Sequence, residues 1–389
     1  MIVINKLYFW KFQHSIRIIY ITLLKNLILI FMKKALIIIF VVLSCIQANA
    51  QTLTGVVYDK ATKQSIPGAY VYLDGTSIVD VTTNSGKFTL STKQLINTKL
   101  VLSHVGYHPL IIENPFMNLP DTIYMEERSN ILGEVTVQAD RFSRRQKLRA
   151  FREQFLGMTQ AGRSCRIVNE DDIQIWFNVA TKTLFASSEQ PIEVINEYLG
   201  YRIFFTLLDF KAEYSTVTLN PNRSLYGFYA VTTSFTNLNT DDNRRIKRHR
   251  DDIHEISSRN FFKNLANNSL LSADTLQPPT FNVYKNRTPI DLSSYFIIED
   301  TLSLKMLQIP DSIIENKNLV DPLLRITVSQ RNNENSEYPN LLYYSSISFF
   351  TDTLLVDQYG NIDQFDKVFF GGQMGLSRAG DMLPLEYEP

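Results

Sequence analysis

The sequence has little cysteine: Cys45 and Cys165 are the only two in 389 residues. Because Cys45 lies in an N-terminal segment typical of export, the exported chain would keep one cysteine and form no internal disulfide. Stability must then come from buried apolar side chains, and a chain of this length can form two or three domains. We expect Cys165 to be a buried apolar residue rather than a nucleophile, since no histidine lies near it in the sequence.

Histidine is also scarce, which excludes the common zinc hydrolases. The five histidines are His14, His104, His108, His249 and His254. None is followed by glutamate three positions later, and His254-Glu255 has no second histidine, so neither His-x-x-Glu nor His-Glu-x-x-His is present. On one continuous strand His104 and His108 would share a face but lie too far apart to chelate one ion. We therefore predict no metal site and no cofactor.

Glycine-rich phosphate loops and paired-carboxylate signatures are absent as well. Gly375 to Gly380 (GLSRAG) comes close to a nucleophile elbow, but its fifth residue is Ala379 and no strand-to-helix context surrounds it. Ser377 is therefore not expected to act as a nucleophile, and the sequence predicts no catalytic residue.

The first fifty residues contain no acidic residue and six basic ones. Met32-Lys33-Lys34 precedes an apolar run from Ala35 to Leu43, which is too short to span a bilayer, and Ala48-Asn49-Ala50 follows. A charged start, a short apolar core and a small-residue site are typical of a secretory signal peptide. We predict that residues 32–50 form this signal, with cleavage between Ala50 and Gln51.

Two alternatives for the N-terminal segment remain open. Residues 16–31 resemble a membrane anchor, although Lys25 lies in their middle and a charge there is costly. Val42-Leu43-Ser44-Cys45 resembles a lipoprotein processing site, which would leave Cys45 lipidated. In the favoured interpretation residues 1–31 are an upstream extension, and the protein is exported to the periplasm or associates with the outer membrane.

After residue 50 the chain carries 33 basic and 39 acidic residues and is mildly acidic. The basic cluster Arg244 to Arg250 could attract phosphate groups, but Asp251 and Asp252 follow at once. An exported, acidic chain does not fit nucleic-acid binding. We interpret the cluster as a solvated helix face with internal ion pairs, and an anionic glycan or lipopolysaccharide is the alternative partner.

Residues 51–127 alternate between apolar and polar side chains, as strands with one buried face do. Leu53, Gly55 and Val57 share a face, and Ala69, Val71 and Leu73 share another. About seven short strands are separated by turns at Pro67-Gly68, Asp74-Gly75, Asn84-Ser85-Gly86 and Val105-Gly106. This spacing predicts a seven-stranded β-sandwich of the transthyretin or immunoglobulin type, with Tyr70 and Tyr72 on the face opposite to the core.

Five ordered segments of this region resemble the carboxypeptidase-regulatory-like domain. They are GVVYD (55–59), IPGAYV (66–71), GTS (75–77), TNSGKF (83–88) and LSHVGY (102–107). The resemblance implies a transthyretin-like fold and a non-catalytic module, common at the N-termini of Bacteroidota outer-membrane proteins. Segments further along, such as DQYGNIDQFDKVFFGGQMGLSRAGDMLPLEYEP, resemble an uncharacterised Bacteroidota envelope family with the same N-terminal domain; this likeness implies no site residues.

The rest of the sequence predicts a linker with a helix at residues 128–157 and an α+β module rich in antiparallel strands at residues 158–389. Arg141 to Leu156 reads as a helix that Gly157 ends. A second helix is expected between residues 240 and 271. Residues 131–141 resemble the segment that leads into a receptor plug, but the residues left are too few for the 22-stranded barrel of such a receptor.

The overall expectation is a mainly β, non-enzymatic binding or assembly protein of the bacterial envelope. It would be peripheral to the outer membrane and would have another envelope protein as its partner. Tyr70 and Tyr72 are the candidate contact surface, because aromatic residues are favoured at contact patches, or else they cover the linker helix. The alternative is a hydrolase of glycan or peptide whose active site lies in the second module, with Glu170, Asp171 and Asp172 as candidate carboxylates.

Overall fold

The computed structural model describes residues 33–34, 51–92, 96, 98–128, 141–238, 243–267, 281–301, 304–315, 322–331, 342–364 and 367–389. The expected signal peptide, its cleavage residue Ala50 and the alternative lipidation site Cys45 lie outside the described residues, apart from Lys33 and Lys34. The chain divides into two units, Met1–Gln51 and Thr52–Pro389, and all three hydrophobic cores lie in the second. Within the described ranges, no helix is both long and apolar enough to cross a membrane.

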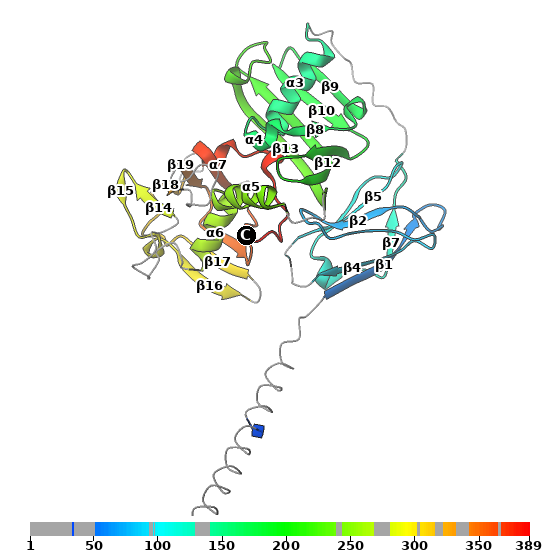
Figure 1. Cartoon of the computed structure of the whole chain (residues 1–389), viewed down its shortest axis with the longest axis horizontal. Coiled ribbons are helices and arrows are strands. Elements are labelled where there is room, and N and C mark those ends of the chain that lie inside the picture. The colour runs from blue at the N-terminus through cyan, green and yellow to red at the C-terminus, as the bar shows by residue number, and fades with distance from the viewer. Residues whose placement is uncertain are drawn as a thin grey trace, which may run out of the picture. The chain divides into compact units, whose positions relative to one another are not determined.

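The described residues are mainly β and contain several antiparallel sheets, as the alternating sequence pattern predicts. The first core lies between a three-stranded sheet of order β4-β1-β7 and a four-stranded sheet of order β3-β2-β5-β6 (Figure 1). The strands of the first sheet are β1 (Gln51–Asp59), β4 (Lys87–Thr92) and β7 (Thr122–Met125). Those of the second are β2 (Tyr70–Leu73), β3 (Val79–Val81), β5 (Leu100–Ser103) and β6 (Leu110–Ile112), and the short helix α2 spans Pro115–Asn118.

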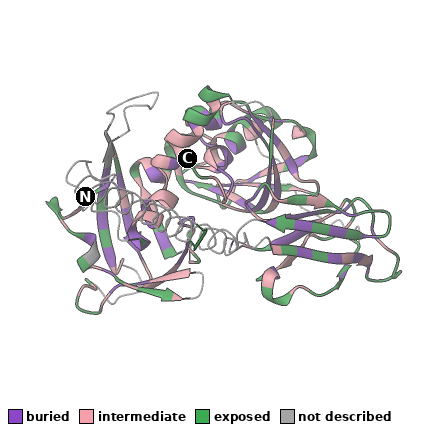
Figure 2. Cartoon of the chain, turned by 60° about the horizontal axis from the view of Figure 1, so that its bottom comes forward, coloured by how far each residue is buried: buried purple, intermediate pink, exposed green. Residues whose placement is uncertain are grey.

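Alternating side chains from the two sheets fill this core. Val57 and Phe88 come from one sheet, and Val71 and Leu102 from the other; all four are buried. Along β4 the residues on either side of the buried Phe88 are exposed. Figure 2 shows the same alternation of buried and exposed positions in the neighbouring strands. The first seven strands therefore make one compact two-sheet body, which we call the N-terminal sandwich (residues 52–127).

The second core is built on a six-stranded antiparallel sheet of order β8-β11-β12-β10-β9, with β13 paired to β12. Its strands are β8 (Cys165–Ile167), β9 (Ile173–Asn178), β10 (Thr183–Ser188), β11 (Ile192–Asn196), β12 (Tyr201–Tyr214) and β13 (Ser224–Asn237). The short helices α4 (Gln160–Arg163), η1 (Glu170–Asp172) and η2 (Pro221–Arg223) connect them.

The helix expected as a linker is instead part of this second core. Helix α3 (Arg144–Phe155) begins at Ser143, whose side chain forms a capping box with Gln146. Phe151 and Phe155 are fully buried, and their rings lie edge-on against Phe210 (4.8 Å) and Phe205 (5.1 Å) of β12. The apolar stripe of this helix is buried because it covers one face of the sheet.

The region after α3 contains two cores rather than one module. The third core packs α6 (Ser258–Ala266) against a five-stranded sheet of order β15-β14-β18-β19-β21 and a three-stranded sheet of order β16-β17-β20. The strands of the former are β14 (Phe281–Lys285), β15 (Thr288–Pro289), β18 (Leu324–Arg331), β19 (Leu342–Phe349) and β21 (Val368–Gly371). Those of the latter are β16 (Ile297–Thr301), β17 (Leu304–Gln308) and β20 (Thr353–Asp357). The short helices are η3 (Leu292–Ser294), α7 (Gly372–Leu376) and η5 (Ala379–Asp381).

The single helix expected between residues 240 and 271 is two helices, α5 (Arg244–Glu255) and α6 (Ser258–Ala266). The break falls at Ser257, whose side chain accepts a hydrogen bond from the Asn260 N–H at 3.1 Å and so caps α6. The apolar stripe alone did not show this break, which the capping serine marks.

The C-terminal segment, residues 377–389, contacts the second core. Asn196 Nδ2 donates to the Gly380 carbonyl at 2.9 Å, and Thr159 Oγ1 donates to Asp381 Oδ1 at 2.6 Å. The approach is close because both segments carry glycine: a Cβ on Gly380 would lie 2.6 Å from Gly162 Cα. Glycine at this point of GLSRAG is therefore explained by packing.

The same segment also reaches the other two cores. Arg259 of α6 donates to the Pro384 carbonyl at 2.8 Å, and the Leu385 N–H donates to the Gly75 carbonyl of the N-terminal sandwich at 2.8 Å. Tyr387 Oη donates to Asp251 Oδ1 of α5 at 2.5 Å. Residues 377–389 therefore tie together the three bodies of the second unit.

Candidate functional site

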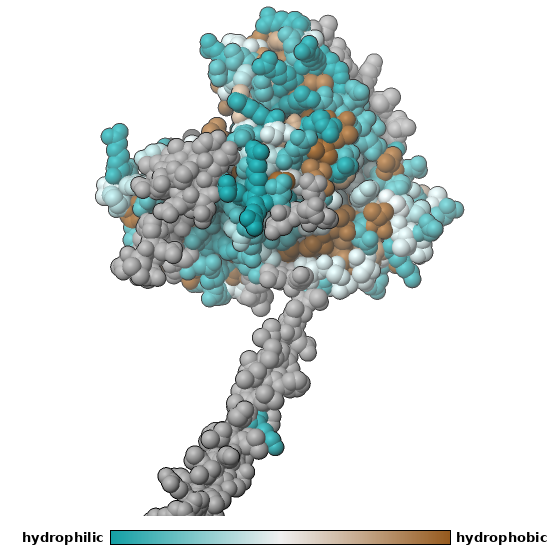
Figure 3. Space-filling view, viewed as in Figure 1, coloured by the Kyte–Doolittle hydropathy of each residue, from teal (hydrophilic) through white to brown (hydrophobic). Residues whose placement is uncertain are grey.

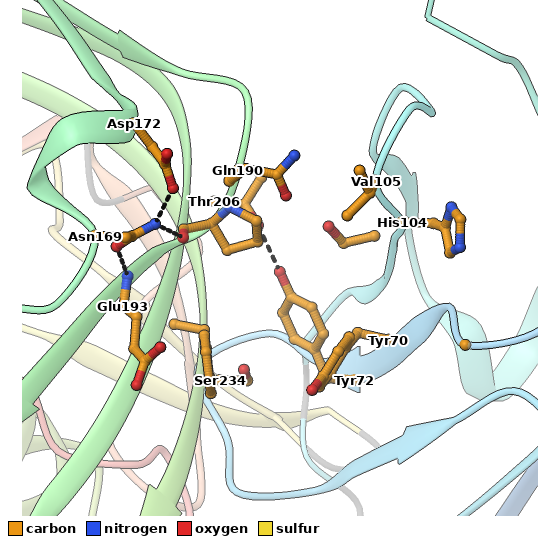
Figure 4. A pocket seen from close by; sticks show the side chains of 14 residues that line it. Tyr70, Tyr72, His104, Val105, Asn169, Asp172, Gln190, Glu193, Thr206 and Ser234 are labelled. Carbon is orange, nitrogen blue, oxygen red and sulfur yellow. Dashed lines mark hydrogen bonds between the residues drawn. The ribbon is translucent and has the colours of Figure 1, made fainter.

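A cavity of about 320 Å³ lies between the N-terminal sandwich and the six-stranded sheet (Figure 4). Strands β2 and β5 and the turn after β5 supply one wall, and β11, β12, β13 and the residues around η1 supply the other. Its aromatic residues are Tyr70, Tyr72 and Phe204, and its acidic residues are Asp172 and Glu193. The cavity thus combines apolar ring faces with carboxylate and amide groups.

The two tyrosines predicted as a contact surface meet the second core of the same chain. Tyr72 is only 3 % exposed, and its hydroxyl lies 3.1 Å from Thr206 Oγ1 and 2.9 Å from Thr232 Oγ1. Burial raises the pKa of Tyr72, so its hydroxyl stays protonated. Tyr70 is 48 % exposed, and its ring centroid lies 6.1 Å from that of Phe204. Tyr72 therefore anchors the wall, and Tyr70 remains open to the cavity. The tyrosines contact β12 and β13 rather than the helix at 144–155.

The turn after β2 fixes this wall by pairing with β13. The Gly75 N–H donates to the Thr233 carbonyl at 2.8 Å, and the Phe235 N–H donates to the Thr76 carbonyl at 2.9 Å. Gly75 has a φ of +75°, which favours glycine, and a Cβ on it would lie 2.9 Å from Leu385 Cγ. The glycine of the GTS segment therefore permits a close approach to both β13 and the C-terminal segment.

Asp74 is the titratable group at this contact. Its Oδ1 accepts a hydrogen bond from the Thr233 N–H at 2.7 Å, and burial raises its pKa to about 6. Because the pKa of Asp74 is higher in the folded than in the unfolded chain, its protonated form stabilises the fold. This stability is fully present below the pKa of the unfolded chain and is lost as pH rises through about 6. Asp74→Asn removes this titration. We expect the free energy of unfolding of the variant, relative to wild type, to be higher at pH 7.5 than at pH 4.5 by about 1 to 2 kcal/mol.

Urea unfolding at the two pH values tests this expectation. The matched control is Asp121→Asn, a change at an exposed aspartate of the same sandwich. An Asp74→Asn effect of equal size at both pH values would contradict a buried carboxylate that titrates near pH 6.

Asn169 organises the opposite wall. Its Nδ2 donates to Asp172 Oδ2 at 2.9 Å and to the Pro191 carbonyl at 3.0 Å, and its Oδ1 accepts from the Glu193 N–H at 2.8 Å. Glu193 Oε1 forms an ion pair with Arg202 Nη1 at 2.7 Å. Each of the two cavity carboxylates therefore accepts a hydrogen bond that fixes its position, which suits it to bind a ligand.

The three acids that the sequence proposed for a hydrolase all lie in the short helix η1 but differ in their contacts. Glu170 forms an ion pair with Arg152, Asp171 and Asp172 are both exposed, and of the three Asp172 lines the cavity. The second acid of the cavity, Glu193, was missed. The alternation in IEVIN, with Ile192 and Val194 buried, is the signal that places Glu193 on the outer face of β11.

The other residues singled out by the sequence form no reactive centre among the described residues. His104 lies on the cavity rim with its ring edge-on to Tyr107 at 5.2 Å. Cys165 donates to the Ala161 carbonyl at 3.3 Å, and burial raises its pKa to about 12, which disfavours a thiolate nucleophile. Ser377 follows α7 on the surface. Within the part of the chain that the structure describes, no three His, Cys, Asp or Glu residues are grouped to hold a metal ion.

Residues 53–137 match the family model of the CarboxypepD_reg-like domain. A comparison of the chain with curated proteins finds no match. The matched range includes the cavity residues Tyr70, Tyr72 and His104, whereas Asn169, Glu193 and Phe204 lie beyond it. The similarity therefore concerns one wall of the cavity, and the opposite wall must be interpreted from its own residues.

Proposed function

We propose that this protein is a non-enzymatic binding protein of the bacterial outer envelope, exported and peripheral to the outer membrane. Its N-terminal sandwich is a transthyretin-like domain of the kind carried by Bacteroidota envelope proteins. The cavity between this domain and the six-stranded sheet is the binding site for a small polar ligand. The protein is accessory to an outer-membrane complex.

The observation that carries this proposal is the cavity itself. A concave site with apolar ring faces and a few fixed polar groups is the usual form of a small-molecule site. The exposed ring of Tyr70 offers an apolar surface, and Asn169 is oriented by three hydrogen bonds. Because Asp172 and Glu193 already accept hydrogen bonds from Asn169 and Arg202, they support ligand recognition more directly than proton transfer.

One feature favours a hydrolase as the second candidate. Asp172 and Glu193 lie in the same cavity on separate elements, and hydrolysis of a glycosidic bond uses two carboxylates on either side of the bond. In that case Asp172→Asn and Glu193→Gln would each abolish turnover of an aryl glycoside or a dipeptide while leaving the fold intact.

The binding proposal is tested with a panel of neutral monosaccharides, disaccharides and dipeptides. Calorimetric titration of the full chain is expected to identify at least one binder whose affinity falls about tenfold in Tyr70→Ala. The matched control is Tyr124→Ala, which removes a tyrosine of similar exposure from β7 of the same sandwich. Binding that is equal in wild type and Tyr70→Ala would rule out the cavity, and turnover of the bound compound would favour the hydrolase.

A further inference from the structure

The six-stranded sheet has a second face that the cavity uses only in part. Its inner face carries buried residues such as Phe177, Leu184 and Phe210 against α3. Its outer face carries the alternate residues. In the half of the sheet near the sandwich, these are the cavity residues Phe204 and Glu193, which lie opposite each other on β12 and β11.

The other half of the outer face carries a row of aromatic residues across four strands. Pairing places Trp176 of β9 opposite Phe185 of β10, Phe185 opposite Lys211 of β12, and Lys211 opposite Phe228 of β13. Residues directly opposite on one face of a sheet are in side-chain contact distance. We call Trp176, Phe185, Lys211, Phe228 and the neighbouring Tyr226 the aromatic row.

The rings of the aromatic row lie in two stacked pairs. Trp176 and Phe185 stack with centroids 5.6 Å apart and planes within 14°, and Tyr226 and Phe228 stack at 6.4 Å with the same angle. Lys211 Nζ lies 5.2 Å from the Phe228 ring centroid. Tyr226 is 47 % and Phe228 37 % exposed, so both rings reach solvent. Figure 3 shows hydrophobic side chains gathered in a few places among hydrophilic ones on the face that it draws.

The aromatic row continues the surface of the cavity. Asp172, the last residue of η1, lines the cavity and directly precedes β9. On β9, Gln174 and Trp176 lie on the outer face, since Ile173 is buried and Ile175 packs against the core. Four residues of extended chain span about 13 Å, so Trp176 lies within reach of a short oligosaccharide that enters the cavity beside Asp172. On β12 the outer residues Phe204 and Lys211 also share this face, although the bulge near Asp209 lies between them.

We propose that the aromatic row and the cavity together bind a linear, neutral oligosaccharide chain. The C–H faces of pyranose rings stack on aromatic rings, and their hydroxyl groups bond to carboxylates and amides such as Asp172 and Asn169. The row carries Lys211, and the same strand carries Asp209 and Glu213 beside it, so the mixed charge favours a neutral chain over an anionic one. This inference rests on the proposed binding function and names its ligand.

Trp176 provides the test, because Trp10 is the only other tryptophan of the chain. In full-length Trp10→Phe protein, Trp176 is the only source of tryptophan fluorescence. This fluorescence is followed during titration with neutral hexasaccharides of glucose, β-1,4-linked or α-1,4-linked, and with the matching disaccharides. We expect a saturable change with one hexasaccharide series. Phe228→Ala should weaken hexasaccharide binding about tenfold and leave disaccharide binding within about twofold, whereas Tyr70→Ala should weaken both. Met117→Ala, at a side chain 83 % exposed on the sandwich, should change neither.

The outcomes separate this inference from the binding proposal. If Phe228→Ala leaves hexasaccharide affinity unchanged while Tyr70→Ala lowers it, the aromatic row is not a subsite and the cavity stands. If dipeptides bind and no saccharide does, the ligand class is wrong. A dimer at micromolar concentration that Trp176→Ala disperses, with no saccharide response, would assign the face to a second copy of the chain and overturn the inference.

Discussion

Gly380→Ala is expected to lower the free energy of unfolding by about 3 kcal/mol, because the added methyl group has no space. A Cβ at this position would lie 2.4 Å from the Leu156 carbonyl oxygen and 2.6 Å from Gly162 Cα. Both atoms belong to the backbone, so no side-chain rotation relieves the overlap. The C-terminal segment would have to move away from α3 and α4, and urea unfolding measures the loss.

Gly227→Ala is the matched control for this substitution. A Cβ on Gly227 would meet only Gln154 Oε1, at 3.0 Å, and that side chain can rotate away. We expect a change within about 1 kcal/mol. Equal unfolding midpoints for Gly380→Ala and wild type would contradict the close packing of the C-terminal segment against α4.

Acidification is expected to destabilise the protein through His254 of α5. The ring is only 4 % exposed, and burial, followed by the nearby charges of Arg259 and Lys263, lowers its pKa to about 4. Because this pKa is lower in the folded chain than the unfolded value of about 6.5, protons bind the unfolded chain first. The stability present above about pH 6.5 is therefore lost as pH falls towards 4. We expect this group to cost about 2 to 3 kcal/mol between pH 7 and pH 4, as measured by urea unfolding across this range.

The comparison with His254→Gln isolates this effect. Asp251 and Glu388 also act on the ring and favour its charged form, but less strongly than burial disfavours it. Asp74 titrates in the same window with the opposite sign, so the wild-type profile alone understates both groups. The difference between wild type and His254→Gln should therefore change between pH 7 and pH 4; a difference that is constant with pH would rule out a neutral buried imidazole.

The alternating pattern of residues 51–127 predicted the buried faces of the N-terminal strands well. Period-two alternation is set locally, by which side of a strand meets a core, so Leu53, Val57 and Val71 were assigned correctly from sequence. The division of the following residues into two cores was not predicted. It depends on contacts between distant strands, and no local pattern distinguishes a strand of one core from a strand of the other.

The candidate site was predicted only in part for the same reason. Tyr70 and Asp172 were singled out individually, one as an exposed ring and one as a carboxylate. Their partners Glu193 and Phe204 join them only through the register of β11 and β12, which the sequence does not state. The stacked rings of Trp176 and Phe185 likewise form one surface only because β9 pairs with β10, and the sequence alone does not show this pairing.

The contacts of the C-terminal segment also determine when the cavity can form during folding. The Ser77 N–H bonds to Glu386 Oε1 at 2.7 Å, which joins residues 309 positions apart. Closing a loop of that length is entropically costly and slow compared with pairing neighbouring strands. The strand pairings of the sandwich all lie within residues 51–125, but its contacts with residues 385–386 need the C-terminal end of the chain. We therefore expect the two walls of the cavity to meet late in refolding, after the sandwich has formed.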